Sequence, residues 1–254
     1  MEAFSLSRIE MSCLLLSLTG HSDRKPLHIL QGAWSKFHQM EVQEGKSLPA
    51  FLSTDIPPIL QKIIKGGSVK GLSLGEIASL GQLIEYSTLS VTAMQNWVKR
   101  DFKEYLGSPR EGKKYSMNQA ALLFIIDDLK ASLDFESIRQ LFHLMFLKPE
   151  RDDDDLIEPA RLYYEYAGLF EEIKRNPTMQ ARGMEAVDLS NAASWKNSPL
   201  IASTERIINR LAHLTRTQQE VVRNMLLIAA ISVQTSYCQS LARQYFNAAL
   251  FLDF

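Results

Sequence analysis

The sequence has only two cysteines in 254 residues, Cys13 and Cys238, and they lie far apart. Such sparse cysteine excludes a disulfide framework, gives no metal-type spacing and fits a reducing compartment. Charge of one sign is lacking too, because 28 Lys and Arg nearly cancel 29 Asp and Glu. A global field that attracts nucleic acid or membranes is therefore excluded, and any charge effect must be local.

Long apolar runs are also scarce. The stretch 225–233 has nine residues, about half of the ~20 that a bilayer requires. The early run CLLLSL is short, and Glu2 and Glu10 precede it instead of the basic cluster of a signal peptide. We therefore expect a soluble, cytoplasmic protein without a membrane span.

Signatures of catalysis and cofactor binding are missing from the sequence as well. We find no Gly-rich phosphate loop, nucleophile elbow or paired carboxylates, and the five histidines lack zinc-ligand spacing. The acidic run 152–155 lacks the residues that a calcium loop needs after it. We expect no metal, no cofactor and no enzyme; a catalytic site assembled from scattered residues is the remaining enzymatic alternative.

The sequence does contain a regular series of helical segments. Capping boxes begin at Ser73, Ser116 and Thr217, and Ser90 and Asp134 are further N-caps. The fold class that we predict is mainly α, with at most a small β wing. The expected helices are about 5–19, 27–38, 57–65, 73–84, 90–100, 116–129, 134–145, 156–174, 204–213 and 217–250.

The acidic, Pro-flanked segment KPERDDDDLIEP (148–159) is typical of a linker and indicates a domain boundary. We predict three parts: an N-terminal helical segment 1–71, a compact helical domain 72–148, and a C-terminal helical region 149–254 for dimerisation or effector binding.

The helix expected at 90–100, within STLSVTAMQNWVKR, has one apolar and one polar face. Small and amide side chains on a short helix can enter the DNA major groove and pair with base edges. Residues 99–114 follow with an excess of three positive charges, which suits backbone phosphates.

The stretch LSLGEIASLGQL…LSVTAMQNWVKR…LGSPREGKKYSMNQAALLFIIDDLKASLDFESIRQLF resembles the MerR-type winged helix-turn-helix domain. It resembles more closely the bacterial domain-of-unknown-function family 1836, whose members carry this MerR-like unit. The resemblance implies a transcriptional regulator of double-stranded DNA, with Trp97 in the core. It implies DNA contacts from recognition helix 90–100 (Thr92, Gln95, Asn96, Lys99 and Arg100) and from the basic wing 103–115 (Arg110, Lys113, Lys114 and Tyr115).

A protein-interaction module that retains the helix-turn-helix fold without binding DNA is the alternative function. It is favoured by the neutrality of 72–148, where nine basic residues oppose nine acidic ones. The polar face of helix 90–100 is then a solvated surface.

The C-terminal region raises two further hypotheses. The last helix is apolar on all sides at 225–233, and a row of small residues predicts a homodimer through it, with burial inside one subunit as the alternative. An aromatic stripe indicates an effector pocket for an unknown small molecule, with ordinary core packing as the alternative. The small residues are Ala229, Ser232, Ser236 and Ser240, and the aromatic ones are Tyr163, Tyr164, Tyr166, Phe170 and Trp195.

Overall fold

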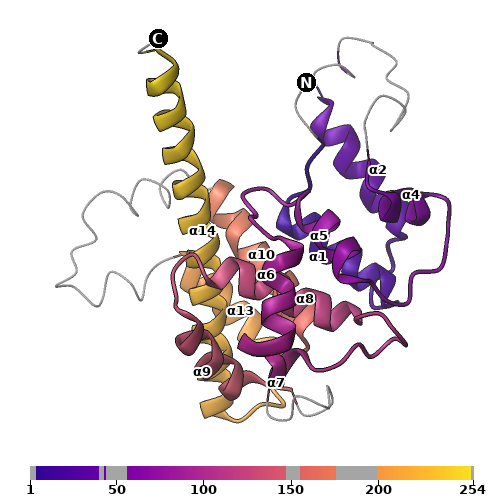
Figure 1. Ribbon diagram of the computed structural model, residues 1–254. Coiled ribbons are helices and arrows are strands. Elements are labelled where there is room, and N and C mark those ends of the chain that lie inside the picture. The colour runs from indigo at the N-terminus through magenta and orange to yellow at the C-terminus, as the bar shows by residue number, and fades with distance from the viewer. Residues whose placement is uncertain (1–3, 40–42, 44–55, 147–154, 176–198, 253–254) are drawn as a thin grey trace. The chain divides into compact units, whose positions relative to one another are not determined.

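The computed structural model describes residues 4–39, 43, 56–146, 155–175 and 199–252, which are mainly helical (Figure 1). The chain forms two compact units, one of residues 1–124 with 159–161 and one of residues 125–158 with 162–254. The predicted mainly α class is confirmed, and extended pairing in the described residues is limited to isolated bridges. The boundary expected near 149 lies outside the described residues.

Among the described residues, the first unit contains six short α-helices, the turn η1 and the beginning of α8. Helix α6 runs directly into a five-residue π-helical turn, η1, and the two together occupy the expected helix 90–100. Helix α7 lies where only a loop was expected. The bounds are α1 (Arg8–Leu18), α2 (Pro26–Phe37), α4 (Pro58–Ile64), α5 (Leu74–Gly81), α6 (Val91–Asn96), η1 (Trp97–Asp101), α7 (Lys103–Leu106) and α8 (Met117–Leu129).

The predicted caps of α5, α6 and α8 are confirmed. The Glu76 amide donates to Ser73 Oγ at 3.2 Å, while the Ser73 amide donates to the Glu76 carboxylate at 2.7 Å. Ser90 accepts from the amide of Ala93 at 3.2 Å. These bonds satisfy amides that the first helical turn leaves without partners, which is why the starts were predictable from local sequence. Ser116 and Gln119 make the same reciprocal pair.

The N-terminal segment pairs with the loop between α5 and α6. The Leu6 amide donates to the Leu83 carbonyl at 2.7 Å, and the Glu85 amide donates to the Leu6 carbonyl at 3.2 Å. The Arg8 guanidinium, only 2% exposed, donates to the Glu85 carbonyl at 2.6 Å. These hydrogen bonds hold the loop from a segment almost eighty residues earlier.

The second unit contains α9 (Phe135–Met145), α10 (Pro159–Arg175) from residue 162 onward, α13 (Pro199–Arg210) and α14 (Arg216–Leu252). The predicted cap of α9 is confirmed, since Asp134 accepts from the Ser137 amide at 2.7 Å. The predicted cap of α14 is wrong by two residues. Thr215 and Gln218 form the capping box, at 2.9 and 3.3 Å, whereas Glu220 pairs with Arg223.

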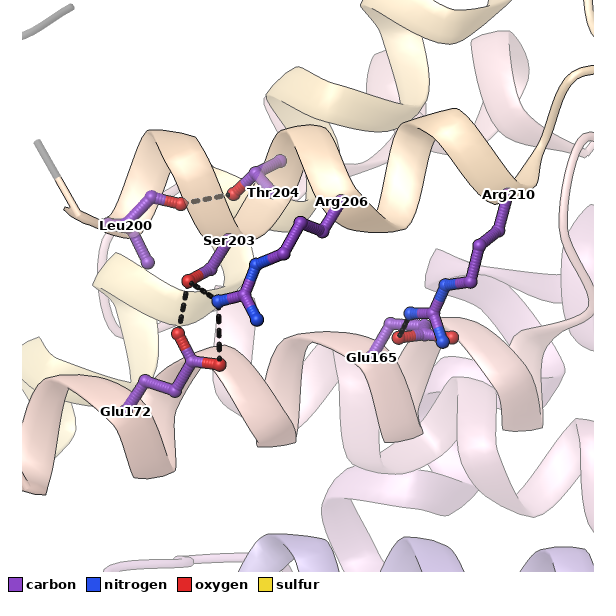
Figure 2. A network of polar contacts seen from close by, with 7 residues as sticks. All are labelled: Glu165, Glu172, Leu200, Ser203, Thr204, Arg206 and Arg210. Atoms are coloured by element: carbon purple, nitrogen blue, oxygen red, sulfur yellow. Dashed lines mark hydrogen bonds and ion pairs between the residues drawn. The ribbon is translucent and has the colours of Figure 1, made fainter. Parts of the chain in front are cut away.

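Helices α10 and α13 lie side by side and are joined by two polar clusters (Figure 2). Arg210 donates to the Glu165 carboxylate at 2.9 Å, and this carboxylate is almost completely buried. Glu172 accepts from the Ser203 hydroxyl and lies 3.5 Å from Arg206, which also donates to Ser203 at 2.6 Å. The pairing of these helices is thus specified by charge in addition to apolar packing.

The aromatic stripe of α10 forms the core of the second unit. Tyr163 and Tyr166 are fully buried, Phe170 is 1% exposed, and the Tyr166 hydroxyl donates to the buried Asp128 carboxylate at 2.7 Å. Core packing, the alternative in the sequence, therefore accounts for these rings, and the effector-pocket hypothesis loses the residues on which it was based. Tyr164 of the same stripe is half-buried, and Trp195 lies outside the described residues.

Helix α14 changes character along its length. Its first half is packed inside the second unit, where Met225, Ala229 and Ser232 are fully buried. By length and apolar composition Arg216–Phe251 could cross a membrane, although a third of its most apolar window is buried within the fold. Burial inside one subunit accounts for Ala229 and Ser232, whereas Ser236 and Ser240 are half-buried, and a homodimer through this helix stays a prediction.

Candidate functional site

Helix α6 and the turn η1 that continues it bury three apolar side chains and expose the polar ones, but Val91, the first apolar residue of α6, is exposed, so the predicted separation holds only in part. Met94, Trp97 and Val98 are buried, at 0%, 3% and 9% exposure, and the Trp97 ring meets Phe102 edge to face. Thr92, Gln95 and Asn96 are exposed, as are Lys99 and Arg100 on η1. All five residues predicted on this helix therefore present their side chains to solvent.

The approach of α5 to the loop before α6 depends on a glycine. A Cβ on Gly81 would lie 2.7 Å from Leu89 Cδ2 and 3.2 Å from Leu89 Cβ. Leu89 is 3% exposed and directly precedes Ser90, the N-cap of α6. This close packing fixes where α6 begins relative to α5.

Residues 107–115 return the chain to the start of α5. Leu72 and Tyr115 exchange two backbone hydrogen bonds, of 2.9 and 2.8 Å, in an antiparallel bridge. Glu111 and Lys114 form a second bridge of 2.9 and 3.1 Å, closed through Gly112 at φ +67°. The predicted small wing is therefore a tight turn at 111–114, beside the first turn of α5.

Gln119 holds the base of this turn. Its Nε2 donates to the carbonyls of Leu106 and Ser108, at 2.5 and 2.8 Å. Its Oε1 accepts from the amides of Arg110 and Ser116, at 3.3 and 2.9 Å. A single buried amide thus satisfies four backbone groups, and it joins the end of α7 to the start of α8.

Lys114 is half-buried and ion-paired, and Tyr115 is buried. The Lys114 ammonium lies 3.0 and 2.8 Å from the two carboxylate oxygens of Glu76. Partial burial opposes ionisation of Glu76, yet the bonds from Lys114 and Ser73 outweigh it and lower the pKa of this carboxyl group. The Tyr115 ring is 9% exposed, and its burial raises the pKa of the phenol. Lys114 positions the turn, and Tyr115 packs beneath it.

The exposed cations of this region are Lys99, Arg100, Lys103, Arg110 and Lys113. Arg100 lies 2.8 Å from Asp101, which raises the pKa of its guanidinium. Because Glu76 neutralises Lys114, the positive excess of residues 99–114 falls from three to two. We define the α6 surface as these five cations with Thr92, Gln95 and Asn96.

Sequence reasoning missed the long-range contacts of two residues that shape this surface, Glu76 and Gln119. Both were identified from their capping boxes, but their second partners are remote: Lys114 is 38 residues from Glu76, and Leu106 is 13 residues from Gln119. No local spacing signals such pairings. Within the described ranges, no group of three His, Cys, Asp or Glu side chains is placed to hold a metal ion.

Comparison with known proteins identifies the family to which the chain belongs. The model of the Domain of unknown function (DUF1836) matches residues 74–166, from the first residue of α5 into α10. The "Uncharacterized protein YkrK" of Bacillus subtilis (strain 168) is 34% identical over 247 residues, covering 96% of this chain and 97% of the relative. The chain belongs to the DUF1836 family. No solved structure matches it.

Proposed function

We propose that this protein is a cytoplasmic transcriptional regulator that binds double-stranded DNA through a MerR-like winged helix-turn-helix. Helices α5 and α6 are the helix-turn-helix, α6 enters the major groove, and the turn at 111–114 is the wing. The observation that carries this proposal is the division of α6 and η1 between buried Met94 and Trp97 and exposed Gln95 and Asn96.

The chemistry of the α6 surface suits a duplex. The amides of Gln95 and Asn96 can donate to and accept from base edges at once, as adenine requires. Lys99 and Lys103 follow directly, and Arg110 and Lys113 stand on or beside the turn that Lys114 and Glu76 tie to α5. Exposed cations after the helix and at the turn suit the phosphate backbones that border a groove.

Binding to duplex DNA at several salt concentrations tests this function. We expect Lys113→Glu to weaken binding to every sequence and to flatten the log–log salt dependence by about 0.9 for each phosphate that the variant no longer neutralises. The matched control is Lys65→Glu at the exposed end of α4, with the same charge change outside the α6 surface. It should leave the salt dependence unchanged apart from a small general effect.

Substitutions on α6 separate base contacts from phosphate contacts. Gln95→Ala or Asn96→Ala should cost roughly 1–3 kcal/mol on the preferred site and little on unrelated duplexes. Genomic fragments captured by the intact protein and sequenced would supply that site. An intact protein that binds no duplex at low salt would refute DNA binding and favour the protein-interaction module, whose support is the balanced charge of residues 72–148.

A further inference from the structure

The second half of α14 is an apolar helix without a cover in the described structure. Every residue from 241 to 251 is exposed, and we call this the exposed segment of α14. Tyr245, Phe246 and Phe251 are 71%, 62% and 81% exposed, and Leu241 and Leu250 are 37% and 47% exposed. Three large rings so open to water on one short helix mark an interaction surface, not ordinary surface scatter.

The helix is anchored at its other end. Val222, Leu226 and Val233 are fully buried in the second unit. Polar contacts continue as far as Thr235, whose hydroxyl lies 3.3 Å from that of Ser132, and Gln239, whose amide donates to the Ala131 carbonyl at 3.5 Å. Figure 1 shows the later part of α14, in yellow, running beyond α9 and α13 of the same unit.

The exposed segment has an apolar and a polar side. Leu241, Tyr245 and Ala248 follow one another at helical spacing, and Ala242, Phe246 and Leu250 form a neighbouring row. Arg243, Gln244 and Asn247 lie on the remaining side, which also carries Phe251, and Leu250 borders Arg243 at the edge of the apolar side. This pattern suits a helix whose apolar side packs against a partner while the other side stays in solvent.

We propose that the exposed segment of α14 binds the same segment of a second copy of this chain. Arg243 is the only charged residue from 225 to 252, so the apolar side offers no charge for an acidic or basic partner to recognise. Two copies can therefore meet apolar side to apolar side with both Arg243 side chains in water. Such a self-complementary face is what a two-fold interface requires.

The available area is sufficient for a small dimer. An aromatic side chain can bury about 150–250 Å², and more than half of each of the two rings on the apolar side, Tyr245 and Phe246, is exposed. Together with Leu241, Leu250 and the exposed Ala242, Ala248 and Ala249 they offer on the order of 500 Å² on each copy, or about 1,000 Å² in a pair, near the lower limit of specific interfaces. Burial of aromatic rings at its centre makes such an interface strong for its size.

A membrane explains the exposed segment less well. Eleven helical residues extend about 16 Å, roughly half of the ~30 Å hydrocarbon thickness. Arg243, Gln244 and Asn247 interrupt them. The more apolar residues 225–233 are largely packed in the second unit and are not available to lipid.

The mass of the full-length protein in solution tests this proposal. Sedimentation velocity over a micromolar concentration series should show a dimer, and Phe246→Asp should raise its dissociation constant about thirtyfold or more, as for a central contact. Asn247→Asp is the matched control, because it puts the same charge one position away on the polar side and should leave the dimer intact. Circular dichroism of both variants should match that of the natural protein, since both positions are exposed.

Other results would overturn the proposal. A natural protein that is monomeric throughout the series excludes the second copy, and a dimer unaffected by Phe246→Asp places the interface elsewhere. Sedimentation of a monomer with phosphatidylcholine–phosphatidylglycerol vesicles, abolished in Phe246→Asp, would assign the segment to a lipid surface instead. Dimerisation here is independent of DNA binding, because mass is measured without DNA and Lys113→Glu should not change it.

Discussion

The Lys114 ammonium lies within 3.0 Å of both carboxylate oxygens of Glu76, across 38 residues of sequence. This ion pair ties the turn at 111–114 to the first turn of α5. Glu76 also caps that helix by accepting from the Ser73 amide. One carboxylate therefore stabilises a helix start and positions the neighbouring turn.

Replacing Glu76 by Gln removes the ion pair while retaining a group that can cap α5. Because the folded protein lowers the pKa of Glu76 below about 4.5, its ionised form stabilises the fold at neutral pH. That contribution is present above the unfolded pKa and is lost as pH falls through the folded pKa. We expect Glu76→Gln to lower the free energy of unfolding by up to about 1 kcal/mol at pH 7.

Urea denaturation of both proteins between pH 7 and pH 3 measures this difference, which should shrink in the acidic range. A double-mutant cycle with Lys114→Gln isolates the pair, because the second substitution should add little once the first is made. A difference that stays constant down to pH 3 would show that ionisation of Glu76 does not contribute.

Gly81→Ala should destabilise the first unit. The new Cβ would meet Leu89 at 2.7 Å, and such overpacking costs about 1–3 kcal/mol, more than the ~0.5–1 kcal/mol that alanine gains over glycine in a helix. Gly75→Ala on the same helix is the control, since its Cβ would meet only Ser73 Oγ at 4.0 Å. Thermal unfolding should give Gly81→Ala a melting temperature below that of the natural protein. The melting temperature of Gly75→Ala should equal or exceed that of the natural protein.

Arg8→Met should loosen the loop between α5 and α6. The substitution removes a buried bond of 2.6 Å to the Glu85 carbonyl, and loss of a buried charged donor costs about 1–3 kcal/mol. Amide hydrogen exchange should quicken at Glu85, whose own amide donates to Leu6. Arg24→Met, at an exposed arginine of the same unit, should change stability by less than about 0.5 kcal/mol. Equal exchange in the two variants would contradict this role for Arg8.

Tyr166→Phe should destabilise the second unit by removing a single hydroxyl. The hydroxyl donates to the buried Asp128 carboxylate at 2.7 Å, and removing a donor from a buried charged acceptor costs about 1–3 kcal/mol. Tyr245→Phe removes a hydroxyl from an exposed ring in the same unit and should cost almost nothing. Chemical denaturation compares the two, and equal stability would show that Asp128 does not depend on Tyr166.

The sequence by itself determined most of the helices and several of their starts, although it missed α7 and began α13 about five residues too late. Apolar spacing and the caps at Ser73, Ser90, Ser116 and Asp134 act within four residues, so their physics is visible in a short window. The orientation of α6 followed in the same way, because buried Trp97 and exposed Gln95 differ only in their position around one helix. Where two capping patterns overlap, as at Thr215 and Thr217, the local signal did not choose between them.

Only the tertiary structure decided which surface residues have partners and which apolar residues remain open. Lys113 and Lys114 are adjacent lysines in the same local sequence, yet only Lys114 is neutralised by Glu76. The apolar residues of α14 are likewise similar along the chain, but α9 and α13 pack against its first half and leave residues 241–251 exposed. Such outcomes depend on segments far apart in sequence that folding brings together, and residue type alone does not specify which segments meet.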